Sequence, residues 1–215
     1  MHDMTEMLQA VHVGGAWLYP ILALALIALA LIIDKLYVYW RYGRLADDLM
    51  DLVETYNFDW KAFEARLLRL RAGHYYGRFF QVIAANRLKP AWWVESRAAD
   101  EASLIDRAFG RGLWALETIV TAAPLLGLLG TISGMIGAFR LFGAKGLVNP
   151  GAVTGGVAEA LIATAFGIFV ALVALFGFNF LSRLQAQVMD QMERLGTRVI
   201  DRIRLDQQER AGEAA

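Results

Sequence analysis

Apolar residues gather in three long blocks, separated by stretches of mixed polar and apolar sequence. The 18 residues from Ala16 to Ile33 carry no charge, and neither do the 22 residues from Thr118 to Phe139. A third stretch, residues 146–182, holds a single charged residue, Glu159, among 37. About 20 apolar residues in a helix span the hydrocarbon core of a bilayer. The pattern therefore predicts an all-α membrane protein with three transmembrane helices.

The organisation of the chain follows from these blocks and from the aromatic residues that flank the first of them. Trp17 and Tyr19 stand at its entry and Tyr37 and Trp40 at its exit, as in the aromatic belts of a membrane span. In chain order we expect an outer segment (1–15), a transmembrane helix (16–40), a cytoplasmic helical region (41–112), a second transmembrane helix (113–139), an outer loop (140–151), a third transmembrane helix (152–182) and a cytoplasmic C-terminal helix (183–215).

Basic residues indicate the orientation, because Lys and Arg favour the cytoplasmic side of a membrane. They follow the first and third blocks and precede the second: Lys35, Arg41, Arg44, Arg97, Arg107, Arg111, Arg183, Arg194 and Arg198. The opposite side carries only Arg140 and Lys145. We therefore expect the N-terminus outside and the C-terminus in the cytoplasm. The first block lacks the basic start and the cleavage site of a signal peptide, so we expect it to be retained.

The polar region between the first two blocks has the pattern of solvated helices. Residues 41–112 mix 12 basic with 10 acidic residues, which does not indicate a nucleic-acid partner. Asn57 or Asp59 can cap a helix that ends at Gly73. A further long helix should run from Ala91 into the second span. The candidate bends in that helix are Gly110, Gly112 and Pro124.

The C-terminal region repeats apolar residues every three or four positions, which predicts an amphipathic helix continuing the third span. The repeating residues are Leu184, Val188, Met192, Leu195, Val199 and Ile203. We expect this stripe to pack on the other cytoplasmic helices, and a partner-binding stripe is the alternative.

Composition removes several kinds of chemistry. The 21 basic and 21 acidic residues cancel, and the chain has no cysteine. It has no Ser/His pair, no HExxH and no P-loop, and its three histidines are far apart in the sequence. We therefore expect no enzyme, no metal site and no cofactor.

The second and third blocks are rich in small residues at helical spacing. Such residues let helix backbones approach closely inside a membrane. The packing candidates are Gly127, Gly130, Gly134, Gly137, Ala160, Ala163 and Gly167. Three spans offer few internal partners for this much close-packing surface, so the pattern favours an oligomer.

Glu159 is the candidate functional residue. An ionised side chain inside a span costs a few kcal/mol unless it is paired or hydrated, and intramembrane acids commonly mark ion or proton pathways. A structural hydrogen bond, or a position closer to the interface, is the alternative for Glu159. Glu117 differs because it stands at the cytoplasmic mouth of the second span and can reach water. Thr131 and Thr164 add hydroxyls within the spans, although threonine often bonds back to its own helix.

Two segments resemble the signatures of the ExbB/TolQ/MotA proton-channel family. Residues 123–139, APLLGLLGTISGMIGAF, resemble the signature of its second span, and residues 157–167, VAEALIATAFG, that of its third. The outer-loop residues Asn149, Pro150 and Gly151 and the late Asn179 look similar too. Three spans in 215 residues favour the ExbB/TolQ-like branch over MotA-like members, which usually have four spans.

The resemblance implies a homopentameric ring in the bacterial inner membrane, embedded in lipid and surrounding an ExbD- or TolR-like single-span partner. It implies that protons serve as the coupling ion and that their gradient energises a TonB- or TolA-like protein. By position, Glu159 would face the pore and the partner, and Thr131 and Thr164 would be paired pore-lining hydroxyls. Val173 stands where the family often has proline, so no kink is expected there.

Other classes of function share some of the features of a proton channel. A non-conducting scaffold ring would use the same small-residue faces, and the stator of a gliding or motility system would share the signatures. A small-molecule permease is disfavoured, because the chain shows no inverted repeat or pair of broken helices.

Overall fold

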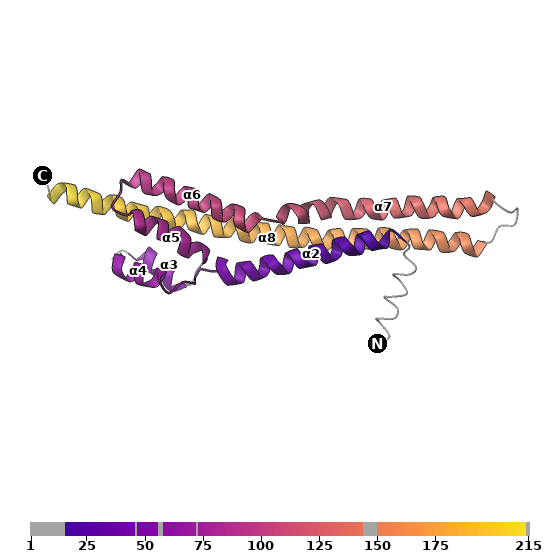
Figure 1. The fold of residues 1–215 in the computed structure, drawn as a ribbon, viewed down its shortest axis with the longest axis horizontal. Coiled ribbons are helices and arrows are strands. Elements are labelled where there is room, and N and C mark those ends of the chain that lie inside the picture. The colour runs from indigo at the N-terminus through magenta and orange to yellow at the C-terminus, as the bar shows by residue number, and fades with distance from the viewer. Residues whose placement is uncertain (1–15, 46, 56–57, 72, 144–149, 214–215) are drawn as a thin grey trace. The chain divides into compact units, whose positions relative to one another are not determined.

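The computed structural model describes residues 16–45, 47–55, 58–71, 73–143 and 150–213 (Figure 1). Every regular element within these ranges is a helix, which confirms the all-α prediction. In chain order the elements are α2 (Leu18–Val38), η1 (Tyr39–Gly43), α3 (Asp47–Glu54), α4 (Trp60–Leu67), α5 (Tyr75–Asn86), α6 (Ala91–Gly110), α7 (Leu113–Gly143) and α8 (Pro150–Glu213).

Three helical stretches are long and apolar enough to cross a membrane: Leu18–Gly43, Ala91–Phe139 and Val153–Gly212. The chain divides into two compact units. The membrane unit comprises the described parts of Met1–Ile33 and Gly112–Phe180, and the polar unit those of Asp34–Arg111 and Leu181–Ala215. The first division falls within α2, between Ile33 and Asp34, and the last falls within α8, between Phe180 and Leu181.

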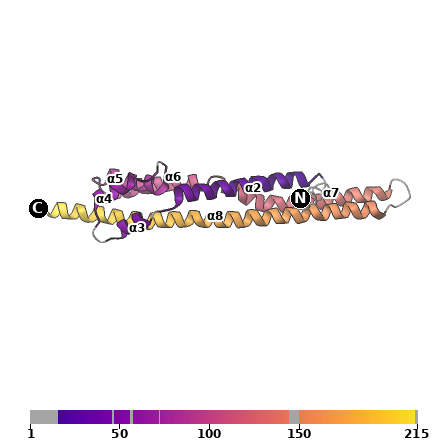
Figure 2. The same ribbon diagram turned by 90° about the horizontal axis from the view of Figure 1, so that it is seen from below.

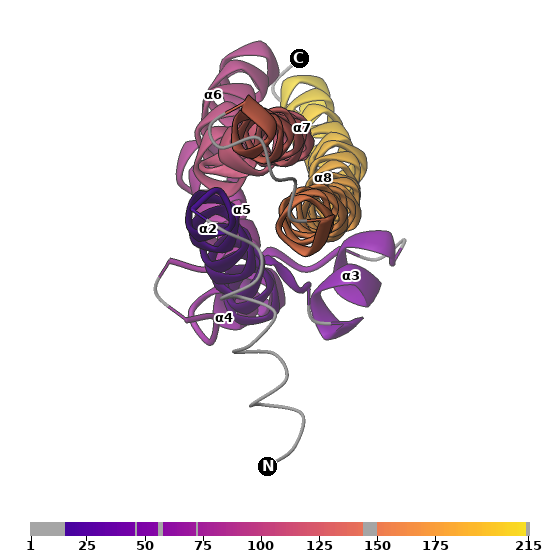
Figure 3. The same ribbon diagram turned by 90° about the vertical axis from the view of Figure 1, so that its right-hand side faces the viewer.

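In the membrane unit, the first part of α2, all of α7 and the first part of α8 form a three-helix bundle, seen end-on in Figure 3. The buried stripe of α7 includes Leu116, Ile119 and Ala123, each at most 3% exposed. Opposite it, α8 buries alanines, among them Ala160 and Ala163. Large apolar side chains cover the outside of the unit, including Leu26, Leu125, Ile136, Phe169 and Phe176. An exposed apolar surface of this kind suits lipid or neighbouring helices.

In the polar unit, α5 and α6 lie along the C-terminal part of α8, as the views in Figures 1 and 2 agree. Phe63, Tyr76, Phe80 and Met192 are fully buried, and the rings of Phe63 and Phe80 meet edge to face at 5.4 Å. The predicted C-terminal stripe is buried as a whole: Leu184, Val188, Met192, Leu195, Val199 and Ile203 are each at most 9% exposed. The stripe therefore packs within the chain, as expected.

The long helix expected from residue 91 into the second span, with candidate bends at Gly110, Gly112 and Pro124, is interrupted at the first two of these and forms two helices. α6 ends at Gly110 and α7 begins at Leu113, and Gly112 between them has a φ of +90°. Glycine adopts this left-handed conformation readily, because it has no Cβ. Pro124 lies inside α7 and does not end it.

Two other expected boundaries also shift. The Asp59 carboxylate caps α4 by accepting a hydrogen bond from the Lys61 amide at 2.9 Å, whereas Asn57 lies outside the described residues. α4 then ends at Leu67 rather than reaching Gly73, and Leu68 is exposed. Helix also enters both ends of the predicted loop 140–151, because residues 140–142 include no glycine or proline and proline suits the first turn that starts at Pro150.

His74 links two segments of the polar unit that lie 30 residues apart in the sequence. Its Nε2 lies 3.1 Å from the Arg44 carbonyl oxygen and donates to it, while its Nδ1 is buried and has no hydrogen-bond partner among the described residues. Burial lowers the pKa of His74 below its ordinary value, and the bond to the Arg44 carbonyl acts in the opposite direction. The folded protein therefore favours the neutral imidazole.

This arrangement predicts that the polar unit loses stability in acid. The unfolded chain takes up the His74 proton at about pH 6.5, and the folded chain only at a lower pH. The stabilising contribution is thus complete at about pH 7.5 and is lost as the pH falls below about 6.5. Thermal unfolding of the detergent-solubilised chain across this range measures the loss. A His74→Gln variant keeps an amide donor for Arg44, and an equally steep acid dependence in that variant would contradict the assignment.

Candidate functional site

Glycines bring the backbones of α7 and α8 into direct contact in the membrane unit. A Cβ built on Gly127 would lie 2.9 Å from the Thr164 Cα, and one on Gly167 would lie 2.5 Å from the Ala123 carbonyl oxygen. Both neighbours are backbone atoms, which cannot swing aside as a side chain can. The two helices are therefore in van der Waals contact through their main chains.

The same contact continues toward the C-terminal end of α7 and the N-terminal end of α8, where alanine replaces backbone as the neighbour. A Cβ on Gly134 would lie 2.8 Å from the Ala160 Cβ, and one on Gly130 would lie 2.9 Å from the Ala163 Cβ. Six of the seven residues predicted to pack thus meet at the α7–α8 contact. Gly137 does not, since a Cβ there would have no described atom within 4 Å.

Glu159 lines a cavity of about 460 Å³ that opens beside this contact. It lies nine residues after Pro150, or about 14 Å along α8. Gly130, Gly134, Gly137, Ala138, Gly156 and Ala160 form the small-residue walls. Ala16 and Trp17 line the cavity next to the start of α2. The glycines and alanines of the walls carry little or no side-chain volume, and the space they leave is the cavity.

The Glu159 side chain is half-buried and makes no hydrogen bond or ion pair with any residue that the structure describes. Ser133 supplies a hydroxyl to the same cavity. A carboxyl group without a protein partner, in a cavity that holds another polar group, can bind water and exchange a proton. Ser133 was not among the residues predicted for the site, although a hydroxyl within the second span was the signal available for it.

The two predicted threonines lie elsewhere in the bundle and make different hydrogen bonds. The Thr164 hydroxyl donates to the Gly127 carbonyl oxygen across the helix contact at 2.8 Å. The Thr131 hydroxyl donates to the Leu128 carbonyl of its own helix at 2.6 Å. Neither residue lines the Glu159 cavity, so the structure groups Glu159 with Ser133 and not with the threonines.

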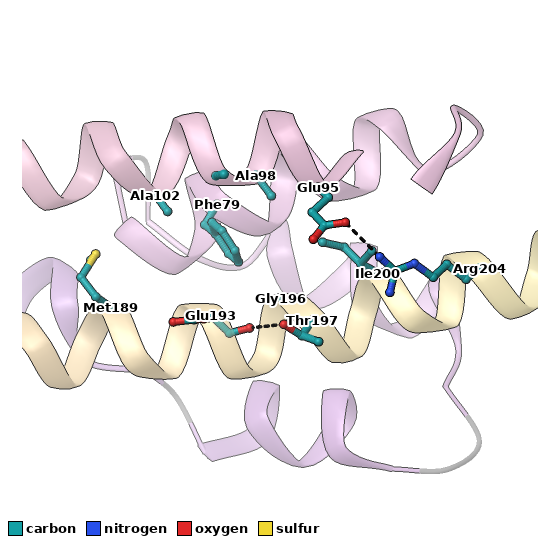
Figure 4. Close-up of a pocket in the computed structure, with 11 residues that line it drawn as sticks. Phe79, Glu95, Ala98, Ala102, Met189, Glu193, Gly196, Thr197, Ile200 and Arg204 are labelled. Carbon is teal, nitrogen blue, oxygen red and sulfur yellow. Dashed lines mark hydrogen bonds and ion pairs between the residues drawn. The ribbon is translucent and has the colours of Figure 1, made fainter. Parts of the chain in front are cut away.

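A further cavity, of about 410 Å³, lies within the polar unit (Figure 4). Its walls are mainly alanines of α6 and the facing turns of α8, with the Phe79 ring against Gly196. Arg204 and Glu95 close one end with an ion pair of 2.9 Å, and the Thr197 hydroxyl donates to the Glu193 carbonyl at 2.8 Å. No group of at least three metal-ligating side chains occurs among the described residues of either unit.

Comparison with known proteins shows to which family the chain belongs. Residues 76–194, which include Glu159 and the whole α7–α8 contact, match the MotA/TolQ/ExbB proton channel family. The chain belongs to this family.

Individual relatives agree with the assignment. A Synechocystis protein named putative biopolymer transport protein ExbB-like 1 is 34% identical over 193 residues, covering 86% of this chain and 74% of its own length. Proteins named biopolymer transport protein ExbB are 45% identical over 82 residues in Xanthomonas campestris and 44% identical over 79 residues in Neisseria gonorrhoeae. These matches cover 38% and 37% of this chain, and the chain spans only 32% and 36% of those two relatives.

The family and the three apolar helices together make this a multi-pass protein of the inner membrane. The roles assigned to Glu159, Thr131 and Thr164 by resemblance stay predictions. The structure adds the position of each side chain and the partner of each hydroxyl.

The packing at Gly134 leads to a test with a neighbouring control. Gly134→Ala should destabilise the bundle by about 1–3 kcal/mol, because the added methyl overlaps Ala160 and the Gly156 carbonyl. In the isolated subunit, Gly137→Ala, three residues along the same helix, should be neutral or stabilising by up to about 1 kcal/mol. Thermal unfolding in detergent compares the two variants. Equal destabilisation by both would show that the close approach is not centred on Gly134.

The threonine hydrogen bonds lead to a second comparison. Thr164→Val removes a bond between helices and should cost about 0.6 kcal/mol and at most about 1.7 kcal/mol. Thr131→Val removes only a bond within its own helix and should change stability little. The same unfolding assay measures both, and a larger loss for Thr131→Val would argue against this distinction.

Proposed function

We propose that this chain is the ring-forming subunit of an inner-membrane complex that conducts protons and converts their gradient into mechanical work. In the proposed complex, copies of the chain form a ring, as a pentamer, around an ExbD- or TolR-like single-span partner. The ring energises a TonB- or TolA-like protein for outer-membrane transport or envelope maintenance. The N-terminus faces the periplasm and the C-terminus the cytoplasm, and protons are the coupling ion with no other cofactor.

The observation that carries this proposal is the unpartnered carboxyl group of Glu159 in the cavity beside the α7–α8 contact. A carboxylate held only for structure would be expected to have a partner, because an isolated charge inside a membrane is costly. A carboxyl that takes up and releases a proton needs instead a hydrated space that the proton can reach. The cavity, with Ser133 at its wall, offers such a space.

Surfaces left free in the membrane unit support an assembly of several subunits. Gly137 and Gly155 have no described neighbour within 4 Å of a built Cβ, although both are small residues of the kind found at helix contacts. Large apolar residues of α7 and α8 are exposed beside them. A neighbouring copy or the partner helix would cover the small residues, and lipid would cover the rest.

In the proposed mechanism, a proton from the periplasmic side neutralises Glu159 and a carboxylate of the partner in turn, and then leaves to the cytoplasm. One charge moving through 100 mV releases about 2.3 kcal/mol. A single proton is a modest drive for mechanical work, so the cycle repeats with several protons. Thr164 is engaged with the Gly127 carbonyl in the isolated chain, so its part in a pore would require exchange of that hydrogen bond.

A non-conducting scaffold ring is the second candidate. The observation that favours it is that both threonine hydroxyls have partners within the chain. A scaffold would keep the small-residue packing and would have no need of a protonatable Glu159. A stator for gliding or motility would share the channel and differ in the protein that it drives.

The decisive experiment is proton flux in liposomes that hold the full chain and its partner. Glu159→Gln removes the titratable group with little change of shape and should reduce flux by at least tenfold. Glu117→Gln provides the matched control, because Glu117 is an exposed acid near the start of α7. It should leave both flux and assembly unchanged. Normal flux in assembled Glu159→Gln complexes would remove Glu159 from the pathway and favour the scaffold.

A further inference from the structure

The end of the first membrane helix carries two arginines that have no counter-ion among the described residues. After α2 the chain continues as one turn of π-helix, η1, from Tyr39 to Gly43. Arg44 follows directly, with its guanidinium 5.6 Å from the centre of the Trp40 ring, and Arg41 lies 5.7 Å from the centre of the Tyr42 ring. Neither arginine makes an ion pair with a residue that the structure describes.

Packing and a hydrogen bond hold in place the turn that carries these arginines. Gly43 is buried, and a Cβ there would lie 3.2 Å from the Tyr39 ring and 3.5 Å from the Phe109 ring. The Tyr39 and Phe109 rings meet edge to face at 6.3 Å. The His74 Nε2 also donates a hydrogen bond to the Arg44 carbonyl oxygen. The backbone from residue 39 to 44 is therefore held by packing and hydrogen bonding, while Trp40 and the Arg44 side chain face outward, and Trp40 is 67% exposed.

The nearest carboxylate within α2, that of Asp34, forms no ion pair with Arg41 or Arg44 among the described residues. Asp34 acts electrostatically on Lys35 and on Tyr75. Lys35 itself also experiences the positive charge of Arg111. The inner end of the first helix thus has more positive than negative charge.

The position of the turn along the helix indicates what would neutralise it. The uncharged part of the first span ends at Ile33, and Trp40 follows about 10 Å further along the helix. This is the depth at which lipid headgroups lie and at which tryptophan is enriched in membrane proteins. A phosphate there would meet arginines, which form bidentate bonds with phosphate, and an indole beside the acyl chains.

We propose that Trp40, Arg41 and Arg44 form a binding site for an anionic phospholipid, with the lipid phosphate between the two guanidinium groups. The site lies on the first helix, apart from the residues assigned to proton conduction. It would fix the inner end of the first span to the membrane surface. A general attraction of basic residues to anionic membranes would not need the fixed turn or the indole contact.

The chain supplies a matched control for this site. Arg97 also lies over a tryptophan, 5.2 Å from the centre of the Trp93 ring, but it forms an ion pair of 2.9 Å with Asp100. Arg97 is on α6, about 20 Å along the helix from Arg111, the C-cap residue whose charge acts on Lys35. Replacing Arg97 removes the same charge from the protein without touching the proposed site.

The test is tryptophan quenching by brominated lipid in vesicles that contain the full chain. Brominated phosphatidylglycerol is compared with brominated phosphatidylcholine at equal total lipid. The Trp40→Phe variant defines the part of the signal that comes from Trp40. We expect Trp40 to be quenched more by phosphatidylglycerol. The preference should fall about fivefold for Arg41→Gln or Arg44→Gln and about 25-fold for the double variant, following the usual contribution of one basic residue near an anionic surface.

Arg97→Gln should keep the full preference, and soluble glycerol phosphate should not compete. Equal quenching by the two lipids, a preference retained in the double variant, or an equal loss in Arg97→Gln would each overturn the proposal. Competition by glycerol phosphate would show a site for free phosphate instead of lipid, and would overturn it too. If the double variant fails to fold, the results of the two single variants decide the test. None of these results depends on proton flux.

Discussion

The close approach of α7 and α8 is the constraint on which the membrane unit depends. Lipid gives two apolar helices no hydrophobic reason to associate, so their contact relies on shape and on hydrogen bonds. Gly127 and Gly167 allow main chain to touch main chain, and the Thr164 hydroxyl adds a hydrogen bond at the same level. A side chain larger than hydrogen at either glycine would have to push backbone aside.

The same small residues account for the cavity that holds Glu159. Where glycine meets backbone, the helices touch; where glycine and alanine face an opening, no side chain fills it. Close packing and the open space beside Glu159 thus come from one choice of residue type along α7. This explains how a span made almost wholly of apolar residues can house a carboxyl group that has no partner among the described residues.

The sequence predicted those features that depend on local signals. The three spans, the capping of α4 by Asp59 and the buried stripe of α8 each follow from residue types within a few turns. The break at Gly112 was among the expected bends, but the sequence could not tell a bend from a complete interruption, because that depends on a backbone angle. The extent of α4 was overestimated, because Leu68 fits a helical apolar pattern and yet is exposed.

The candidate site was predictable in its residues and not in its grouping. Glu159 was evident as the one charge in its span, yet its neighbour Ser133 and the acceptor of the Thr164 hydroxyl depend on how α7 and α8 align, which no local pattern encodes. Within the membrane unit, Ala160, Ala163 and Gly167 of α8 follow one another at spacings of three and four residues, and each meets α7. Each residue of an α-helix turns the next by about 100°. A single deletion between Ala160 and Gly167 would therefore turn one part of this contact face away from α7, whereas substitutions at the intervening positions keep its direction. The length of this interval should thus be held more strictly in evolution than its composition.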